Sequence, residues 1–460
     1  MKEKKSGKGY RFDENGWIYL HIEGDAFERG FQHGFLAAPE LDQILKSVKY
    51  LTYFNTGKMW EFFVDAAVSL FLKFLEGDDD YQEFLNEMQG IAAGAREGGT
   101  NVTWQEILAW NGYEELTDYW WPNAIDKYRY APSGCCKDHC SAFMAHGEAT
   151  ADGKIVMAHN TWNNFEMGQF CNVILDINPS SGHEIFMQSS PGFIESQTDF
   201  FLTGAGIMGT ETTIGGFSLY DENEVPEFVR IRKAMQYADN LDEFVNLMKK
   251  KNNGGYANSW LLGNSKTNDI MRFELGLKFY NVELNPTEHY FVGFNAPLDP
   301  RIRNLECSNT GFADIRRHQG ARQVRLPQLI KKYYKSITCE IAQTIIADHG
   351  DVYPVETEAD TNINPCSRTV CGHYELDDRA YMSDPSRPKP YQPRGAVDGK
   401  VCDSGMAENL SFWARWGNSC GMEFDADTFL DNHPQWDYLR GYLFSRSSQD
   451  WTQFSAGQNQ

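Results

Sequence analysis

The first third of the chain carries a mostly helical pattern of apolar and polar positions. An alternating stretch at residues 17–24, WIYLHIEG, predicts a strand, and Asp25 after it is suited to cap a helix. Apolar residues then recur at three- and four-residue steps, while Gly30, Gly34 and Pro39 predict a break or a close contact between helices. The helical pattern continues in residues 62–75, 81–96 and 103–116.

The pattern changes to short β-branched or aromatic segments after Cys140. CSAFMAHG and KIVMAHN predict two strands, and the Asp152-Gly153 pair between them suits a two-residue hairpin turn. Further strand-like segments lie at residues 171–177, 184–190, 206–214, 258–264 and 270–275. Helical segments interrupt them at residues 225–237, 241–250, 321–334 and 340–347. Sheets interrupted by paired helices predict a layered α/β sandwich.

Residues 120–139 separate the two patterns. This segment has no periodicity and contains two prolines and one glycine, so we expect a loop or linker there. It divides the chain into a helical N-terminal segment, residues 1–139, and a strand-rich segment, residues 140–460.

Composition limits the class of protein. The 460 residues, 41% apolar and 14% aromatic, are typical of a globular chain with a large core. The formal net charge of −22 argues against binding to nucleic acid or to an anionic membrane surface. The most apolar run, residues 62–75, contains Asp65 and Lys73 and is too short to span a bilayer. The charged first ten residues lack the apolar stretch of a signal peptide, so we expect a cytosolic chain or one whose leader is missing.

The ten cysteines give no metal-binding pattern. They include no C-x-x-C pair, so we expect no zinc site. Cys366 with Cys371, and Cys402 with Cys420, are suited either to disulfides in an oxidising compartment or to buried free thiols.

Cys140 opens a predicted strand, and a catalytic thiol there needs a base. His139 points to the opposite face of an extended chain, and His146 lies far along the strand, whereas His159 on the second strand can approach. A cut between His139 and Cys140 offers another base, because the free α-amine of Cys140 has a pKa near 8. The thiol itself can make that cut by attacking the carbonyl of His139. The alternative is that Cys140 is one more half-buried strand cysteine.

The segment CSAFMA…GKIVMAHNTW resembles the opening of the catalytic chain in the phospholipase B-like family of N-terminal nucleophile (Ntn) hydrolases. Residues 206–216, 254–264 and 414–439 are similar to further family segments, and residues 24–41 resemble the related acyl-CoA:6-aminopenicillanate acyltransferase group. The matches span nearly the whole chain. The resemblance implies an α+β fold, a four-layer αββα sandwich with a helical N-terminal segment. It also implies a precursor that cuts itself before Cys140 and keeps both pieces together.

The resemblance assigns roles near the cysteine. Cys140 becomes the nucleophile with its own amine as base, and His159 and Trp162 line the pocket beside it. The alternative for these two is a strand-end histidine and a core tryptophan. The wider superfamily often has Arg-x-x-Asp at this place, and the Asp is absent here. Thr213 or Thr212 then holds the amine; alternation lets only one face the site, and we prefer Thr213, unless both simply fill β positions.

Asn258 is our candidate for the oxyanion hole. Acyl transfer builds negative charge on the carbonyl oxygen, and a fixed amide donor contributes about 3 kcal/mol of barrier reduction. The alternative is that Asn258 satisfies a backbone group. A site arginine is also typical of the superfamily, and Arg322 or Arg325 is the candidate for substrate binding, although a solvated arginine is equally compatible with the sequence.

We therefore expect a self-processed hydrolase that cleaves a linear amide, or an acyl ester, through an acyl-Cys140 intermediate. The substrate is a small acyl amide or a lipid; no cofactor, metal, nucleic acid or integral membrane is expected, and the two chains stay associated. Four alternatives remain: an acyltransferase on the same scaffold, a phospholipase B-type lipid deacylase, an uncut thiol hydrolase with a separate histidine, and a lipid- or peptide-binding protein without turnover.

Overall fold

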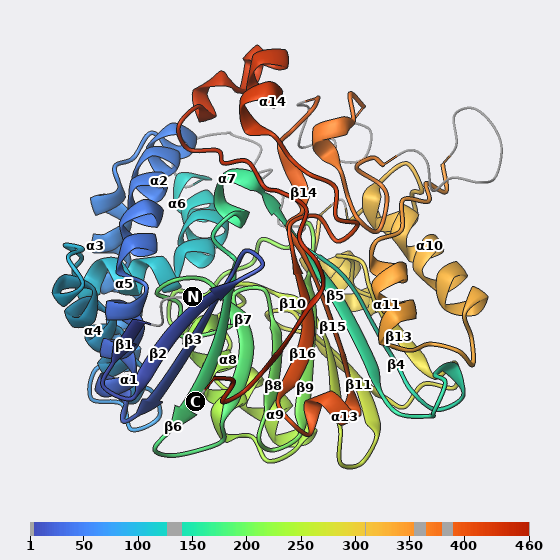
Figure 1. Ribbon diagram of the computed structural model, residues 1–460, viewed down its shortest axis with the longest axis horizontal. Coiled ribbons are helices and arrows are strands. Elements are labelled where there is room, and N and C mark those ends of the chain that lie inside the picture. Colours follow the sequence, from blue (N-terminus) through green and yellow to red (C-terminus); the bar gives the residue numbers. More distant parts are fainter. Residues whose placement is uncertain (1–3, 127–139, 309, 354–364, 380–389, 460) are drawn as a thin grey trace.

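Two β-sheets form the centre of the protein (Figure 1). The computed structural model describes residues 4–126, 140–308, 310–353, 365–379 and 390–459. Within these residues one sheet has ten strands, in the order β1-β2-β3-β6-β7-β8-β9-β10-β11-β12. The other has seven, in the order β13-β4-β5-β15-β16-β17, with β14 paired to β5.

The N-terminal segment contributes three strands to the ten-stranded sheet. The strands of this sheet are β1 Lys4–Ser6, β2 Gly9–Glu14, β3 Trp17–Gly24, β6 Val173–Pro179, β7 Ile185–Ser189, β8 Phe200–Thr203, β9 Ile207–Thr213, β10 Asn258–Asn264, β11 Asp269–Leu275 and β12 Tyr280–Leu284. β3 pairs with β6 in parallel, joining residues 18–24 to residues 173–179. The strand predicted at residues 17–24 is thus confirmed, and it is bonded to the strand-rich segment.

In sequence order, the first strand of the seven-stranded sheet begins at Cys140. Its strands are β4 Cys140–Ala145, β5 Val156–Asn164, β13 Tyr290–Gly293, β14 Arg394–Ala396, β15 Asp398–Asp403, β16 Ser411–Trp416 and β17 Thr452–Ser455. β4 lies between β13 and β5 and is antiparallel to both. β5 pairs with β4 from Cys140 onward, and β13 pairs with it from Ala142 onward.

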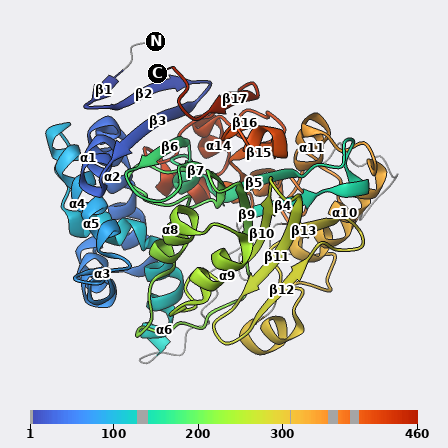
Figure 2. The same cartoon turned by 90° about the horizontal axis from the view of Figure 1, so that it is seen from below.

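The two sheets pack face to face, and helices cover both outer faces. Helices α1 (Ala26–Leu36), α8 (Glu227–Tyr237) and α9 (Leu241–Lys249) bury apolar side chains against the ten-stranded sheet. Helices α10 (His318–Lys332) and α11 (Cys339–Ile346) cover the seven-stranded sheet. Side chains of both sheets fill the space between them, among them Met144, Phe186, Leu261 and Phe412. The layers are therefore helix, sheet, sheet and helix, with α10 and α11 on the far side from α1 (Figure 2).

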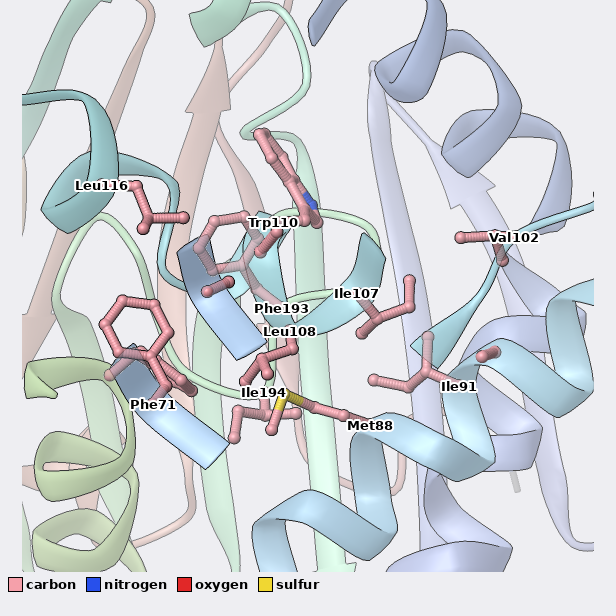
Figure 3. Close-up of a cluster of buried hydrophobic side chains, with 14 of the residues drawn as sticks. Phe71, Met88, Ile91, Val102, Ile107, Leu108, Trp110, Leu116, Phe193 and Ile194 are labelled. Carbon is pink, nitrogen blue, oxygen red and sulfur yellow. The ribbon is translucent and has the colours of Figure 1, made fainter. Parts of the chain in front are cut away.

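The rest of the N-terminal segment is a block of helices with its own core. The helices are α2 Ala38–Thr56, α3 Trp60–Leu75, α4 Gln82–Glu97, α5 Trp104–Asn111, a π-helix at Glu115–Trp120 and α6 Trp121–Asp126. Figure 3 shows Phe71, Ile91 and Trp110 of this core together with Phe193 from the strand-rich segment. This core therefore joins the two segments of the chain.

Helices α1 and α4 cross at unusually close range because glycines face each other. A Cβ on Gly34 would lie 1.9 Å from the carbonyl oxygen of Ile91, and one on Gly94 would lie 1.9 Å from that of Phe31. Asp25 caps α1 with a capping box to Glu28, as the sequence predicts. The glycines thus mark a close helix contact, and the predicted break falls between α1 and α2.

Two local predictions are wrong. Residues 121–126 form helix α6 instead of a loop, while residues 127–139, which include His139, lie outside the described residues. Ten residues, not two, join β4 to β5. The reason is that the connection forms its own contacts: Thr150 makes a parallel bridge to Ile337, and the Gly147 N–H donates to the Gly153 carbonyl at 3.0 Å.

Short helices complete the described structure. They are the 3₁₀ turns Gly147–Ala149, Tyr374–Leu376 and Pro434–Leu439, the π-helix Ile302–Glu306, and α7 Phe165–Gly168, α13 Ser404–Ala407 and α14 Ala426–Asn432. No helix in the described part of the chain combines the length and the hydropathy needed to cross a bilayer.

Gly34→Ala tests the close crossing of α1 and α4. The added methyl group would meet the Ile91 carbonyl, so the helices must separate, and we expect the free energy of unfolding to fall by about 1–3 kcal/mol or more. Urea denaturation followed by circular dichroism measures the change. Gly204→Ala is the control, because its Cβ would lie 3.6 Å from the nearest atom. Equal stability of both variants would contradict the packing argument.

Candidate active site

Cys140 is the first residue of β4, and its backbone is fixed at both polar groups. It pairs with Thr161 of β5, its side chain is 1% exposed, and its N–H donates to the Asn295 side chain at 3.4 Å. Its carbonyl accepts a hydrogen bond from Arg322. The backbone on which the thiol stands is therefore held rigidly.

Asn295 links the start of β4 to the end of β9. Its side-chain amide donates to the Thr213 carbonyl at 2.8 Å, and its side-chain oxygen also accepts from Arg322 at 2.8 Å. Its φ of 64° lies in the left-handed region that asparagine tolerates better than most residues. Asn295 therefore joins the two sheets beside Cys140.

The thiol of Cys140 contacts the buried carboxyl group of Glu211 on β9. The distance from Sγ to Oε1 is 3.8 Å, and the Tyr256 hydroxyl donates to the same oxygen at 3.2 Å. Asn258, with its amide nitrogen turned toward acceptors, donates to the other Glu211 oxygen and to the Ala257 carbonyl, both at 3.0 Å. The Glu211 carboxyl thus bridges the thiol and the amide of Asn258.

Burial controls the protonation of this pair. It raises the pKa of Glu211 to about 8, although the hydrogen bond from Tyr256 opposes the shift. Burial, and then the Glu211 charge, raise the pKa of the Cys140 thiol well above its ordinary value, with Lys400 opposing them. The thiol therefore carries its proton at neutral pH.

The structure separates the two candidate threonines. Thr213 shares a face of β9 with Glu211 because side chains alternate along a strand, and it stands opposite Asn258 in the register. Thr212 points to the other face, where its Cγ2 would be 2.6 Å from a Cβ on Gly293. Thr213 and Asn258 therefore lie beside Glu211, which contacts the thiol, whereas Thr212 lies on the opposite face of β9 and packs against β13.

The two candidate arginines have different surroundings. Arg322 on α10 is buried; besides Asn295 and the Cys140 carbonyl it contacts the Ser141 hydroxyl at 3.0 Å, and it stacks on Trp162 with 4.1 Å between its guanidinium carbon and the ring centre. Arg325 forms a two-pronged ion pair with Asp348 instead, with both distances at 2.7 Å. Arg322 supports the backbone of Cys140, and Arg325 lies outside this group.

Trp162 and His159 are both buried, but on different faces of β5. Trp162 packs with Cys371 and Tyr374, on the face away from the thiol. His159 is two residues from Thr161, on the face of the Cys140 thiol, yet neither ring nitrogen has a hydrogen-bond partner. Burial, and then the Lys400 ammonium, keep the pKa of His159 well below its usual value, so its ring is neutral.

Lys400 on β15 is a buried cation between the two sheets. It donates to Thr161 Oγ1 at 2.7 Å and pairs with Asp398 at 2.9 Å. It also bonds to Gln188 of β7 in the ten-stranded sheet. A positive charge is thus fixed next to the strand pair that carries Cys140, and burial lowers its pKa.

Sequence reasoning missed four residues of this group, namely Tyr256, Glu211, Asn295 and Lys400. Glu211 lies in the GTETT segment, and a carboxyl group inside an otherwise buried strand is a signal because glutamate is rarely buried without a partner. Tyr256 stands two residues before Asn258 in the GGYANSW segment. Asn295 and Lys400 carry no comparable signal, since strand pairing within the seven-stranded sheet, which the sequence does not reveal, brings them near Cys140.

Possible metal ligands lie apart from the thiol. Within the described residues, His349, Cys371, His373 and Cys420 have ligand atoms that all lie within 4.8 Å of one another. The eight described cysteines are free, so neither Cys366 with Cys371 nor Cys402 with Cys420 forms a disulfide. Cys371 instead approaches Cys420, a partner that the sequence spacing did not suggest.

Comparison with known proteins places the chain in a family. Residues 14–307 match the family described as Phospholipase B. The chain is 27% identical over 263 residues to an uncharacterized protein of Archaeoglobus fulgidus, covering 55% of this chain and 42% of that one. It is 24% identical over 304 residues to a phospholipase B of Crotalus adamanteus, covering 60% and 51%. It is 23% identical over 490 residues to phospholipase B-like 1 of Bos taurus, covering 89% and 82%.

The share of each chain that is matched decides whether the comparisons establish family membership. The matched parts span about half the length of the archaeal and snake proteins. The family match covers well over half of this chain and includes Cys140, Glu211, Asn258 and Asn295. It confirms the resemblance that the sequence indicated. The chain belongs to the phospholipase B family.

Proposed function

We propose that this chain is a self-processing N-terminal nucleophile hydrolase that cleaves a linear amide or an acyl ester through an acyl-Cys140 intermediate. One observation carries the proposal: the thiol of the first residue of β4 is buried against Glu211, whose other carboxyl oxygen accepts from Asn258, in a member of the phospholipase B family. The helix–sheet–sheet–helix layering supports the assignment to the Ntn fold.

The protonation of the site favours a self-supplied base over a separate histidine. A thiol–histidine enzyme needs a thiol with a lowered pKa, whereas burial raises that of Cys140. His159 is neutral and makes no hydrogen bond to the thiol. An α-amine released at Cys140 would stand on the same residue as the thiol, with an ordinary pKa near 8, and would supply the base.

The maturation step that we propose is an N-to-S acyl shift. The Cys140 sulfur attacks the carbonyl carbon of His139, the C–N bond to Cys140 breaks, and the thiol proton passes to the leaving nitrogen. Water then hydrolyses the thioester, which releases the carboxylate of His139 and restores the thiol. Glu211 is suited to relay the proton, because its carboxyl oxygen lies 3.8 Å from the sulfur.

Asn258 would stabilise the oxyanion during turnover. In the uncut chain its amide donates to Glu211 and to the Ala257 carbonyl. The Glu211 oxygen that it holds therefore marks the position that a substrate carbonyl oxygen would take. A substrate carbonyl would have to displace this Glu211 oxygen, after which the amide N–H would stabilise the negative charge that develops in acyl transfer.

Two kinds of acyl bond are candidates for cleavage. We favour a linear amide, and the names of the snake and bovine relatives make a phospholipid ester the second candidate. An acyltransferase would differ only in the acceptor, since an amine would replace water at the acyl-enzyme. Product analysis with added amine separates hydrolysis from transfer, and tight binding unchanged by Cys140→Ser, without turnover, would instead identify a binding protein.

Intact mass under denaturing conditions tests the proposal directly. We expect the wild type to give two fragments, one beginning at Cys140, and Cys140→Ala to stay whole because it lacks the attacking sulfur. Cys402→Ala, which removes another buried thiol, is the control and should still be cut. An uncut wild type across pH 4–8 that nevertheless hydrolyses acyl substrates would overturn the self-base mechanism.

Asn258→Ala tests the oxyanion role in the matured enzyme. Loss of one fixed donor should lower kcat about 100- to 1,000-fold with a small change in KM. Steady-state kinetics on a chromogenic acyl amide or ester, after separation of cut from uncut protein, measures this. Asn264→Ala at the other end of β10 is the matched control and should keep its kcat. A similar loss in both variants would indicate a structural effect of β10 instead.

Glu211→Gln tests the buried carboxyl through the pH dependence of stability. Because the folded-state pKa is raised to about 8 from an ordinary 4.5, the native state retains a proton that the unfolded chain releases. The contribution of the protonated Glu211 carboxyl to the free energy of unfolding is thus complete below pH 4.5, and it is lost as the pH rises to about 8. Urea denaturation of the uncut Cys140→Ala protein at pH 5 and pH 8 should show a smaller loss with Glu211→Gln added. Glu61→Gln, at an exposed site, should not change that loss.

A further inference from the structure

We propose that His349, Cys371, His373 and Cys420 form a structural zinc site behind the strand that carries Cys140. The four residues lie outside the part of the chain that matches the family, residues 14–307. They come from three separate segments: one after α11, one at residues 365–379, and one after β16. The proposal does not depend on the function of Cys140.

The spacing of the ligand atoms fits a tetrahedral zinc ion. His373 Nε2 lies 3.4 Å from the Cys371 sulfur and 3.6 Å from the Cys420 sulfur. Zinc bonds of about 2.3 Å to sulfur and about 2.0 Å to nitrogen, at tetrahedral angles, place S and N about 3.5 Å apart. The Nε2 atom of His349 is buried without a hydrogen-bond partner and is available as the fourth ligand. The side chains thus already surround a zinc-sized position.

A carboxylate orients the central histidine. Glu375 lies 2.7 Å from Nδ1 of His373, and both side chains are buried. The Nδ1–H therefore donates to Glu375, which leaves the lone pair of Nε2 directed at the two sulfurs. Metal-binding histidines are held by a carboxylate in this way, so the contact supports a metal ligand more than a packed core histidine.

An ion has a route to this position. His349 and Cys420 form part of the wall of a surface pocket of about 460 Å³, which Arg415 and Trp451 also line. Cys371 and His373 lie behind them with no exposed surface. Four protein ligands leave no open coordination position, which is typical of structural and not catalytic zinc.

The site would stabilise the support of the nucleophile strand. Within residues 365–379 the regular structure is one 3₁₀ turn, and a β-bridge of His373 to Gly395 joins the segment to β14. Its Val370 carbonyl accepts hydrogen bonds from Ser141 Oγ at 3.0 Å and from Trp162 Nε1 at 3.2 Å. A metal bound one residue further on, at Cys371, would fix the position of this acceptor beside β4 and β5.

Two other arrangements of the same atoms are less suitable. A disulfide between Cys371 and Cys420 would leave both histidines unexplained. A hydrolytic dyad of Cys420 and His373, oriented by Glu375, would need only one thiol, whereas two sulfurs and a second imidazole face this nitrogen. Both arrangements make measurable predictions that differ from those of zinc.

Metal analysis of the purified full-length protein tests the proposal. After gel filtration we expect about one zinc per chain by mass spectrometry of the elements. Cys371→Ser and Cys420→Ser should lose it. Cys366→Ser, a buried thiol in the same segment but outside the cluster, should retain it. Retention of zinc in both cluster variants would overturn the proposal, and so would its absence from wild type prepared with added zinc.

Cobalt substitution covers the case in which the variants do not fold. Wild type treated with a chelator and then with Co²⁺ should show the visible bands of a tetrahedral ion and a sulfur-to-cobalt charge-transfer band, both abolished by Zn²⁺. Absence of these bands would overturn the site. A zinc-free protein whose mass is lower by two hydrogens would identify the disulfide instead. Self-cleavage is read from fragment masses, so failure of the zinc site and failure of the proposed function are distinguishable.

Discussion

The contact between the Cys140 thiol and the buried Glu211 carboxyl is the interaction around which this end of the sandwich is organised. A carboxyl group without water must keep its proton or accept hydrogen bonds, and Glu211 does both at neutral pH. Tyr256 and Asn258 supply the donors, and both lie at or next to the start of β10. The need to satisfy one polar group therefore brings the thiol and the amide of Asn258 to the same place.

The two facing sheets make this arrangement possible. β4 belongs to one sheet and β9 to the other, so a residue at the start of one strand meets residues near the end of the other. Asn295 and Arg322 hold the backbone at the meeting point, and Lys400 ties the sheets together beside it. The thiol stands on a rigid base, and it is protonated and buried.

The sequence predicted the features whose causes are local. Asp25 caps α1 through contacts within one turn, and Gly34 reveals a close helix contact through its missing side chain. The contact of Glu211 with Cys140 depends on how two sheets pack, and alternation along β9 alone does not show which strand faces it. The cluster of Cys371 and Cys420 was missed for the same reason, because 48 intervening residues separate two thiols that the fold brings together. The prediction of a two-residue turn after β4 was wrong because Thr150 in the connection pairs with a distant residue, Ile337.

The parallel pairing of β3 with β6 has a consequence for a chain cut before Cys140. β3 would then belong to the small fragment and β6 to the large one, and seven residue positions in each strand would still be paired. The small fragment would cover the edge of β6 without a covalent bond to it. Its departure would expose that unpaired strand and the apolar surface under α1. Exposed edges of this kind recruit other strands and aggregate. Dissociation of the two fragments would thus be a route to precipitation, and the cut protein would behave in solution as one heterodimeric body.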